Sequence, residues 1–162
     1  MRPERYQLEL FVEPAAGQMR GEARVLLVND SVTAEREVSL LLNRSLEAET
    51  APGLTQEYCA MQDLPSQEVA HVRLELDRAL PPGGRTWIEV RYTGGLSDYT
   101  ASGMSYIRDT IDDEFTILRP DAFAYPVVGP PSHGELWGAD LPMFGYSARA
   151  LVPRDHVVAN GG

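Results

Sequence analysis

Apolar and polar residues alternate along most of this chain, and this period of two residues restricts its fold more than any other feature. In the first segment the apolar residues on one face are Tyr6, Leu8, Leu10 and Val12. Such alternation is typical of a β-strand with one face buried and the other in water. Residues 14–17 (PAAG) then turn the chain, and a second alternating segment runs from Gln18 to Asn29. We therefore expect a long hairpin at the start of the chain.

Further strands are expected at regular intervals along the sequence. Their ranges are Arg36–Leu42, Leu46–Thr50, Gln56–Met61, Glu68–Asp77, Arg85–Tyr92, Gly145–Pro153 and His156–Asn160. Turn signals recur about every 8 to 12 residues, and the sequence contains no long amphipathic helix. This pattern predicts an all-β fold, either a sandwich or saddle-like pair of antiparallel sheets or a barrel.

The 162 residues suit a single β domain with a real hydrophobic core, which we expect to span residues 1–162. The segment Thr93–Leu141 departs from the strand pattern, because it is rich in Gly, Pro, Asp, Ser and Tyr. It is too long for a plain connection in a compact domain. We expect this irregular excursion (93–141) to be functional or to dock on a neighbour.

The charge and the single cysteine exclude several classes of partner. A net charge of -10 argues against a nucleic-acid partner, because phosphate binding requires clustered Lys and Arg side chains. No stretch approaches the roughly 18 apolar residues of a transmembrane helix, and we expect no membrane contact. Cys59 has no second cysteine to pair with, so the sequence gives no evidence for an oxidising compartment. The cellular location stays open.

Three histidines and one acidic cluster are the residues to test as metal ligands. His71, His133 and His156 lack the i, i+4 spacing of a helical zinc site, and we expect each of them to be structural. The acidic residues in 109–114 lack the glycine and the ligand spacing of a calcium loop, which favours a solvated loop. Ser132 lies in no nucleophile elbow. We expect this chain to contain no metal site and no catalytic residue.

Short motifs near both ends of the chain agree in order and spacing with those of one known family. Tyr6–Leu10 and Met19–Val25 have the form Y-x-L-x-L followed by G-x-x-x-hydrophobic. Pro120–Pro126 is similar to P-x-D-A-R-x-x-F-P, Tyr146–Pro153 is similar to a strand that ends in V-P, and His156–Gly161 is similar to a closing hydrophobic-S-N-G. In these motifs the chain resembles the membrane alanyl aminopeptidase family of gluzincin zinc peptidases over residues 6–161.

The resemblance implies a fold and a role. It implies a saddle-shaped, sheet-rich N-terminal domain that packs on a thermolysin-like catalytic domain and helps to wall the substrate cleft. The zinc-binding helix would then lie in the catalytic domain, beyond Gly162, so zinc is expected there and no cofactor is expected in these residues. The implied partners are the protein's own catalytic domain and a peptide substrate.

The chain departs from the family where the family binds substrate. The family motif T-Q-x-E-P uses its Gln and Glu to hold the free amino terminus of a peptide, and the matching residues are Thr116–Pro120, read as TILRP. A guanidinium in place of the carboxylate repels an ammonium group. The resemblance therefore implies a divergent peptidase, one that favours acidic substrate groups, or a protein that keeps the fold without the activity. The candidate residues for the cleft wall are Thr116, Ile117, Arg119, Pro120, Asp121 and Tyr125.

Two alternatives stay open at this point. Arg119 is also suited to a surface or interdomain ion pair, for example with the nearby Asp121. The whole chain is also compatible with a stand-alone β-sandwich module that binds a protein or a carbohydrate, with Trp87 or Trp137 as an exposed anchor. An accessory domain of a peptidase should expose an apolar patch on the excursion, whereas a complete module should cover itself.

Overall fold

The computed structural model describes residues 1–100, 109–136 and 143–159. Within them the chain forms nine strands: β1 Arg2–Glu13, β2 Gln18–Val28, β3 Glu35–Asn43, β4 Leu46–Ala48, β5 Leu54–Ala60, β6 Glu68–Leu80, β7 Arg85–Gly94, β8 Val127–Val128 and β9 Gly145–Leu151. The helical elements are the 3-10 turns η1 Pro14–Ala16 and η3 Pro120–Ala122 and the short helix α1 His133–Leu136. None of the described helices is long and apolar enough to cross a membrane.

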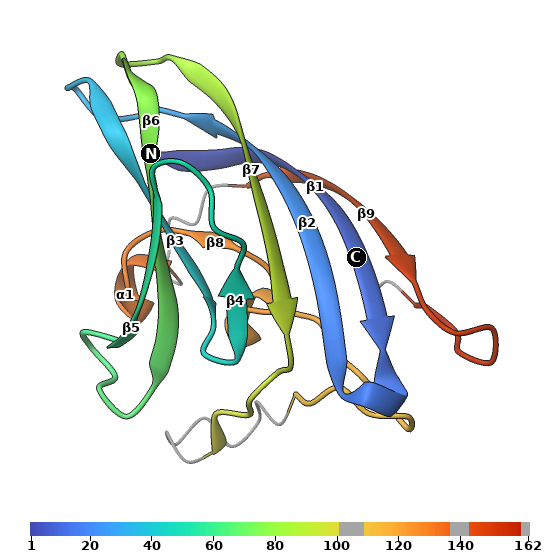
Figure 1. Ribbon diagram of the computed structural model, residues 1–162. Coiled ribbons are helices and arrows are strands. Elements are labelled where there is room, and N and C mark those ends of the chain that lie inside the picture. The colour runs from blue at the N-terminus through green and yellow to red at the C-terminus, as the bar shows by residue number, and fades with distance from the viewer. Residues whose placement is uncertain (101–108, 137–142, 160–162) are drawn as a thin grey trace.

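The strands form two sheets, and Figure 1 shows β5, β6 and β3 at the left and β7, β2, β1 and β9 at the right. The first sheet has the order β4-β7-β2-β1-β9, and the second has the order β5-β6-β3-β8. All pairings are antiparallel except that of β1 with the edge strand β9, which is parallel. The expected all-β fold and the expected first hairpin are therefore confirmed.

The alternating residues of the sequence build the core between the sheets. The row Tyr6, Leu8, Leu10 and Val12 of β1 is at most 6% exposed, and Val25 and Leu27 of β2 are fully buried. The opposite sheet contributes Leu40 and Leu42 from β3 and Val72 from β6. Burying such side chains is the main favourable term in folding, because it removes apolar surface from water.

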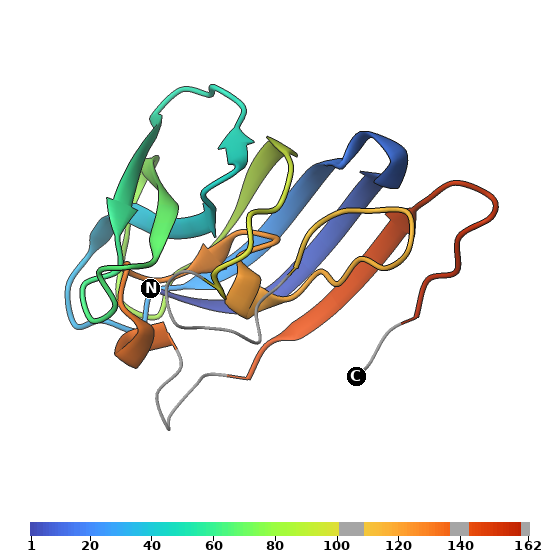
Figure 2. The same ribbon diagram turned by 90° about the horizontal axis from the view of Figure 1, so that it is seen from below.

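The described part of the excursion 93–141 is folded onto the two sheets. Figure 2 shows its yellow and orange portion running from the end of the β1–β2 hairpin back towards β5 and β6. Its buried apolar residues are Leu96, Tyr99, Ile111, Ala122, Phe123, Ala124 and Leu136. Several of them form a second cluster with Leu41 of β3 and Val69 of β6, on the face of the second sheet that turns away from the main core. The excursion therefore covers the outside of this sheet.

Two details of the sequence interpretation were wrong. Residues 156–159 form no strand, although His156–Asn160 alternates, and position 160 lies outside the described residues. A strand needs a partner for its backbone hydrogen bonds, and this stretch has none among the described residues. The two-residue strand β8 was also missed, because Val127–Val128 is too short to show a period and pairs only with Leu40 and Leu41 of β3.

Candidate functional site

Arg119 lies in a carboxylate cluster immediately before η3. Its Nε donates to Asp109 Oδ2 at 2.6 Å and its Nη2 donates to Asp109 Oδ1 at 3.0 Å. This fork geometry is the strongest form of arginine–carboxylate contact. The side chain of Asp109 is only 6% exposed and that of Arg119 is 27% exposed. The Arg119–Asp109 ion pair therefore connects the loop before Ile111 to the start of η3.

A second carboxylate lies close to the same guanidinium. Arg119 Nε is 3.4 Å from Asp121 Oδ1, so the expected Arg119–Asp121 ion pair is present, but the closer partner is Asp109. One guanidinium between two carboxylates leaves a formal charge of -1 on the cluster. Among the described residues of the cluster, this balance leaves no positive charge for an acidic substrate group, which was one of the three possibilities that the sequence left open.

Thr116 closes a turn that Asp112 organises, and Ile117 follows it. Asp112 Oδ1 accepts from the backbone N–H groups of Glu114 and Phe115, both at 2.9 Å, and these bonds lower the pKa of the Asp112 carboxyl. Thr116 Oγ1 accepts from the backbone N–H of Asp112 at 3.3 Å. The Ile117 side chain is 38% exposed. Asp112 thus stabilises an exposed turn, as expected for a solvated loop, whereas Asp109, which was expected in the same solvated loop, is buried.

Pro120 and Tyr125 connect the carboxylate cluster to an aromatic cluster. Pro120 begins η3, where its missing N–H costs no hydrogen bond. The ring of Tyr125 packs edge-on against the buried ring of Tyr6 at 6.0 Å. Burial, with smaller contributions from Tyr146 and Asp121, raises the pKa of Tyr125 to about 12, so this hydroxyl stays protonated at neutral pH.

The aromatic cluster continues onto the edge strand β9 and becomes exposed there. Tyr146 pairs with Tyr6, and Ala148 pairs with Leu8, so these β9 side chains continue the core-facing row of β1. Phe144 lies 4.9 Å from the ring of Tyr6 and is 39% exposed, and Tyr146 is 47% exposed. We call the residues Phe144, Tyr146, Ala148 and Ala150 the β9 row. The core face of the first sheet therefore reaches solvent at β9.

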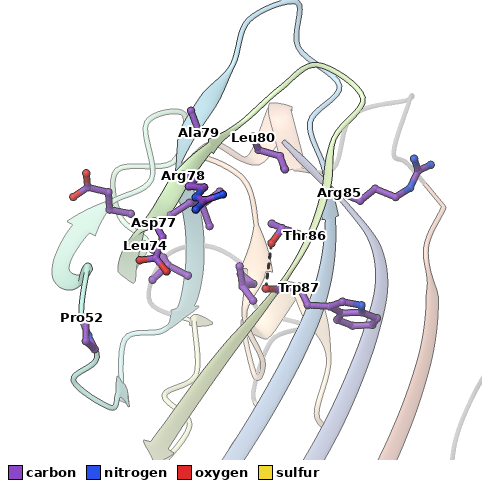
Figure 3. A pocket seen from close by; sticks show the side chains of 12 residues that line it. Pro52, Leu74, Asp77, Arg78, Ala79, Leu80, Arg85, Thr86 and Trp87 are labelled. Atoms are coloured by element: carbon purple, nitrogen blue, oxygen red, sulfur yellow. Dashed lines mark hydrogen bonds between the residues drawn. The ribbon is translucent and has the colours of Figure 1, made fainter.

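A shallow groove of about 500 Å³ lies elsewhere, between the end of β6 and the start of β7. Figure 3 shows Leu74, Asp77 and Arg78 on the β6 side and Thr86 on the β7 side. The predicted cleft residues do not line it.

Trp87, one of the two expected anchors, points its ring away from the groove (Figure 3). The guanidinium carbon of Arg24 lies over this ring, 5.4 Å from its centroid. One face of this expected anchor is therefore occupied, and Trp137 lies outside the described residues.

Two of the three histidines have partners that the sequence did not reveal. His71 Nε2 lies 2.8 Å from Ser39 Oγ, and His71 Nδ1 lies 3.6 Å from Glu57 Oε1. The three residues come from β6, β3 and β5, and only the strand register brings them together. His133 Nε2 contacts Gln67 Oε1. These contacts were not predictable from spacing, because each joins residues more than ten positions apart.

We predict that Arg119→Ala destabilises the protein by about 2 kcal/mol, because it leaves the buried Asp109 carboxylate without its partner. Chemical denaturation of the purified chain measures this change. Adding Asp109→Asn to Arg119→Ala removes the uncompensated charge and should recover part of the loss. A loss below about 0.5 kcal/mol, as for an exposed ion pair, would contradict a structural role for the fork.

No known protein-family model matches the chain, and no curated protein matches its sequence. Solved structures do share its fold. A variant of an M1 zinc metallopeptidase from Deinococcus radiodurans superposes with a TM-score of 0.57 at 14% identity, over 92% of this chain and 32% of that chain. A structure of the same kind with a bound Tyr-Ser-Ala substrate gives a TM-score of 0.56 at 15% identity, with the same coverage. The chain therefore has a metallopeptidase-like fold and spans about a third of the length of these solved chains.

Proposed function

We propose that residues 1–162 form the non-catalytic N-terminal domain of a zinc aminopeptidase-like protein. In this role the domain packs on a catalytic domain and contributes part of the wall of the substrate cleft. Zinc and the catalytic residues belong to that other domain. Among the described residues, no group of His, Cys, Asp and Glu side chains is arranged to hold a metal ion.

The β9 row is the observation that carries this proposal. A sheet normally buries its apolar face, and the rows of β1 and β2 do so. The same face is exposed at β9, where all residues from Gly145 to Arg149 are open to solvent. Exposed apolar side chains that continue a core mark a surface for another protein unit. A catalytic domain that covers β9 would complete the core.

One predicted cleft residue, Tyr125, supports a cleft wall next to this surface. Tyr125 contacts Tyr6, which contacts Phe144 of the β9 row. The carboxylate cluster of Arg119, Asp109 and Asp121 therefore lies near the proposed domain boundary. With its formal charge of -1, it favours a cationic substrate group over an acidic one. Arg119 acts in this proposal as a positioning residue that holds the two carboxylates.

Hydrogen exchange on the protein encoded by the complete reading frame tests the packing. We expect the β9 amides to be protected there and to exchange faster in residues 1–162 alone, because only the first form covers β9. Tyr146→Glu should weaken this protection, whereas Ser147→Glu serves as the matched control, because Ser147 lies on the opposite face of the same strand and pairs with the uncharged Gln7. Equal protection of β9 in both proteins would contradict the proposed packing and favour the stand-alone module.

A further inference from the structure

Two asparagines of the chain lie in the three-residue motif Asn-x-Ser, which accepts N-linked oligosaccharides when x is not proline. The motifs are 29–31 (NDS), which begins directly after β2, and 43–45 (NRS), which begins at the last residue of β3. Such a motif usually marks a surface loop, because the attached sugar is bulky and needs solvent around it. The motifs alone would therefore place both asparagines on the surface.

The structure buries both asparagine side chains instead. Asn29 and Asn43 are each 0% exposed. In both motifs the asparagine Oδ1 accepts from the backbone N–H of the serine two positions later, at 3.0 Å for Ser31 and at 3.1 Å for Ser45. Both motifs therefore form the same Asx turn, and the amide nitrogen that would carry a sugar lies inside the fold.

Both hydrogens of the Asn29 amide are already in use. Its Nδ2 donates to the carbonyl oxygens of Thr33 and Leu80, both at 2.7 Å. A primary amide has only two N–H donors, and N-glycosylation replaces one of them with the anomeric carbon of a sugar. The modified side chain would lose one of these bonds, and its sugar would have to lie in a close-packed interior.

The Asn43 amide is held in the same way, by partners that are synthesised much later. Its Nδ2 donates to the carbonyl oxygens of Ser97 and Ala122, which lie 54 and 79 positions further along the chain. For Asn29 the corresponding separation from Leu80 is 51 positions. At about 5 to 20 residues per second, synthesis needs roughly 3 to 16 seconds to supply these distant partners. A transferase that acts on emerging chains would therefore reach both amides before the fold buries them.

We propose that folding of this domain and N-glycosylation of Asn29 and Asn43 exclude each other, so that the domain reaches its fold only in a compartment that transfers no oligosaccharide to new chains. The donor in the excluded reaction is an oligosaccharide linked to a lipid pyrophosphate. A bond forms between its anomeric carbon and Nδ2, the bond from that carbon to the pyrophosphate oxygen breaks, and Nδ2 gives up one proton. The inference rests on the two buried amides and is independent of the proposed peptidase role.

Secretion from a glycosylating cell tests the consequence for folding. The chain is directed into the secretory pathway with its motifs intact, and also as the double variant Ser31→Ala/Ser45→Ala, which removes both motifs but keeps both asparagine amides. We expect the unaltered chain to be retained in a glycosylated, protease-sensitive form, and the double variant to restore secretion of protease-resistant protein. Equal secretion of the two forms as protease-resistant protein would overturn the proposal.

Oligosaccharide transfer in vitro keeps the test decisive if the double variant does not fold. A solubilised oligosaccharyltransferase with its lipid-linked donor is offered the purified folded chain and two peptides, 26–34 and 40–48, which contain the motifs without the fold. We expect both peptides to be modified, and every chain that keeps the native circular dichroism spectrum to be unmodified. A natively folded chain with a sugar on Asn29 or Asn43, or peptides that accept none, would contradict the mutual exclusion.

Discussion

Gly21→Ala is expected to destabilise the protein by about 3 kcal/mol, at the upper end of ordinary overpacking. Gly21 lies in the middle of β2 and pairs with Tyr92 of β7. The Tyr92 ring fills the space above the glycine, so an added Cβ would overlap its Cζ and hydroxyl oxygen and would lie 2.6 Å from its Cε1. The ring is fully buried, and side chains in a close-packed interior have little room to move aside.

The same substitution in another strand provides the control. At Gly145 of β9 an added Cβ meets only Arg5 Nε, at 4.0 Å, so Gly145→Ala should change stability by less than about 0.5 kcal/mol. Combining Gly21→Ala with Tyr92→Leu shortens the blocking side chain and should cost less than the sum of the two single changes. Urea denaturation of the four variants measures these differences. If Gly21→Ala destabilised the protein no more than Gly145→Ala does, the Tyr92 ring would not occupy the space above Gly21.

Asn43→Ala is expected to cost about 4 kcal/mol, because several buried groups lose their partners at once. The fully buried side chain of Asn43 donates to the carbonyl oxygens of Ser97 and Ala122, at 3.0 and 2.9 Å. It accepts from the backbone N–H groups of Ser97 and Ser45, at 3.0 and 3.1 Å. The side-chain amide of Asn43 therefore joins the end of β3 to two separate parts of the excursion, at Ser97 and Ala122.

Asn29→Ala is the matched control, because Asn29 is equally buried and its side chain makes three hydrogen bonds. These bonds join it to Ser31, Thr33 and Leu80, far from the excursion. Both variants should lower the urea midpoint, but only Asn43→Ala should make residues 95–124 sensitive to limited proteolysis under native conditions. Equal sensitivity of that segment in both variants would contradict the tying role of Asn43.

The period-two pattern was sufficient to predict the strands that build the main core. It worked because successive side chains of a strand point to opposite faces of the sheet. Side chains such as Tyr6 and Leu8 all face the buried layer between the sheets, so apolar residues recur at every second position. The pattern failed at His156–Asn160, where alternation is present but the described residues offer no strand to pair with. Whether a segment finds a partner strand depends on the rest of the fold, and the alternation of its own residues cannot reveal this.

The candidate site was predictable only in part. The pairing of Arg119 with Asp121 is local in sequence and was anticipated, whereas the closer partner Asp109 lies ten residues away across an irregular loop. The contacts of Ser39 and Glu57 with His71 arise from the register of three strands. The exposed apolar patch was expected on the excursion 93–141, where Phe115 and Ile117 are the exposed large apolar residues of the described part. Phe144 and Tyr146, at β9, lie outside that segment and were not anticipated. The cleft role of Thr116, Pro120 and Tyr125 stays a prediction.

The most direct test of the central proposal is a peptidase assay with zinc analysis. The protein encoded by the complete reading frame and residues 1–162 alone should be compared on aminoacyl reporters with neutral, basic and acidic side chains. We predict bound zinc and cleavage in the complete protein, with acidic reporters the poorest substrates, and neither zinc nor cleavage in residues 1–162. A complete protein that binds no zinc and cleaves none of the reporters would contradict the peptidase assignment and leave a binding or structural role for this fold.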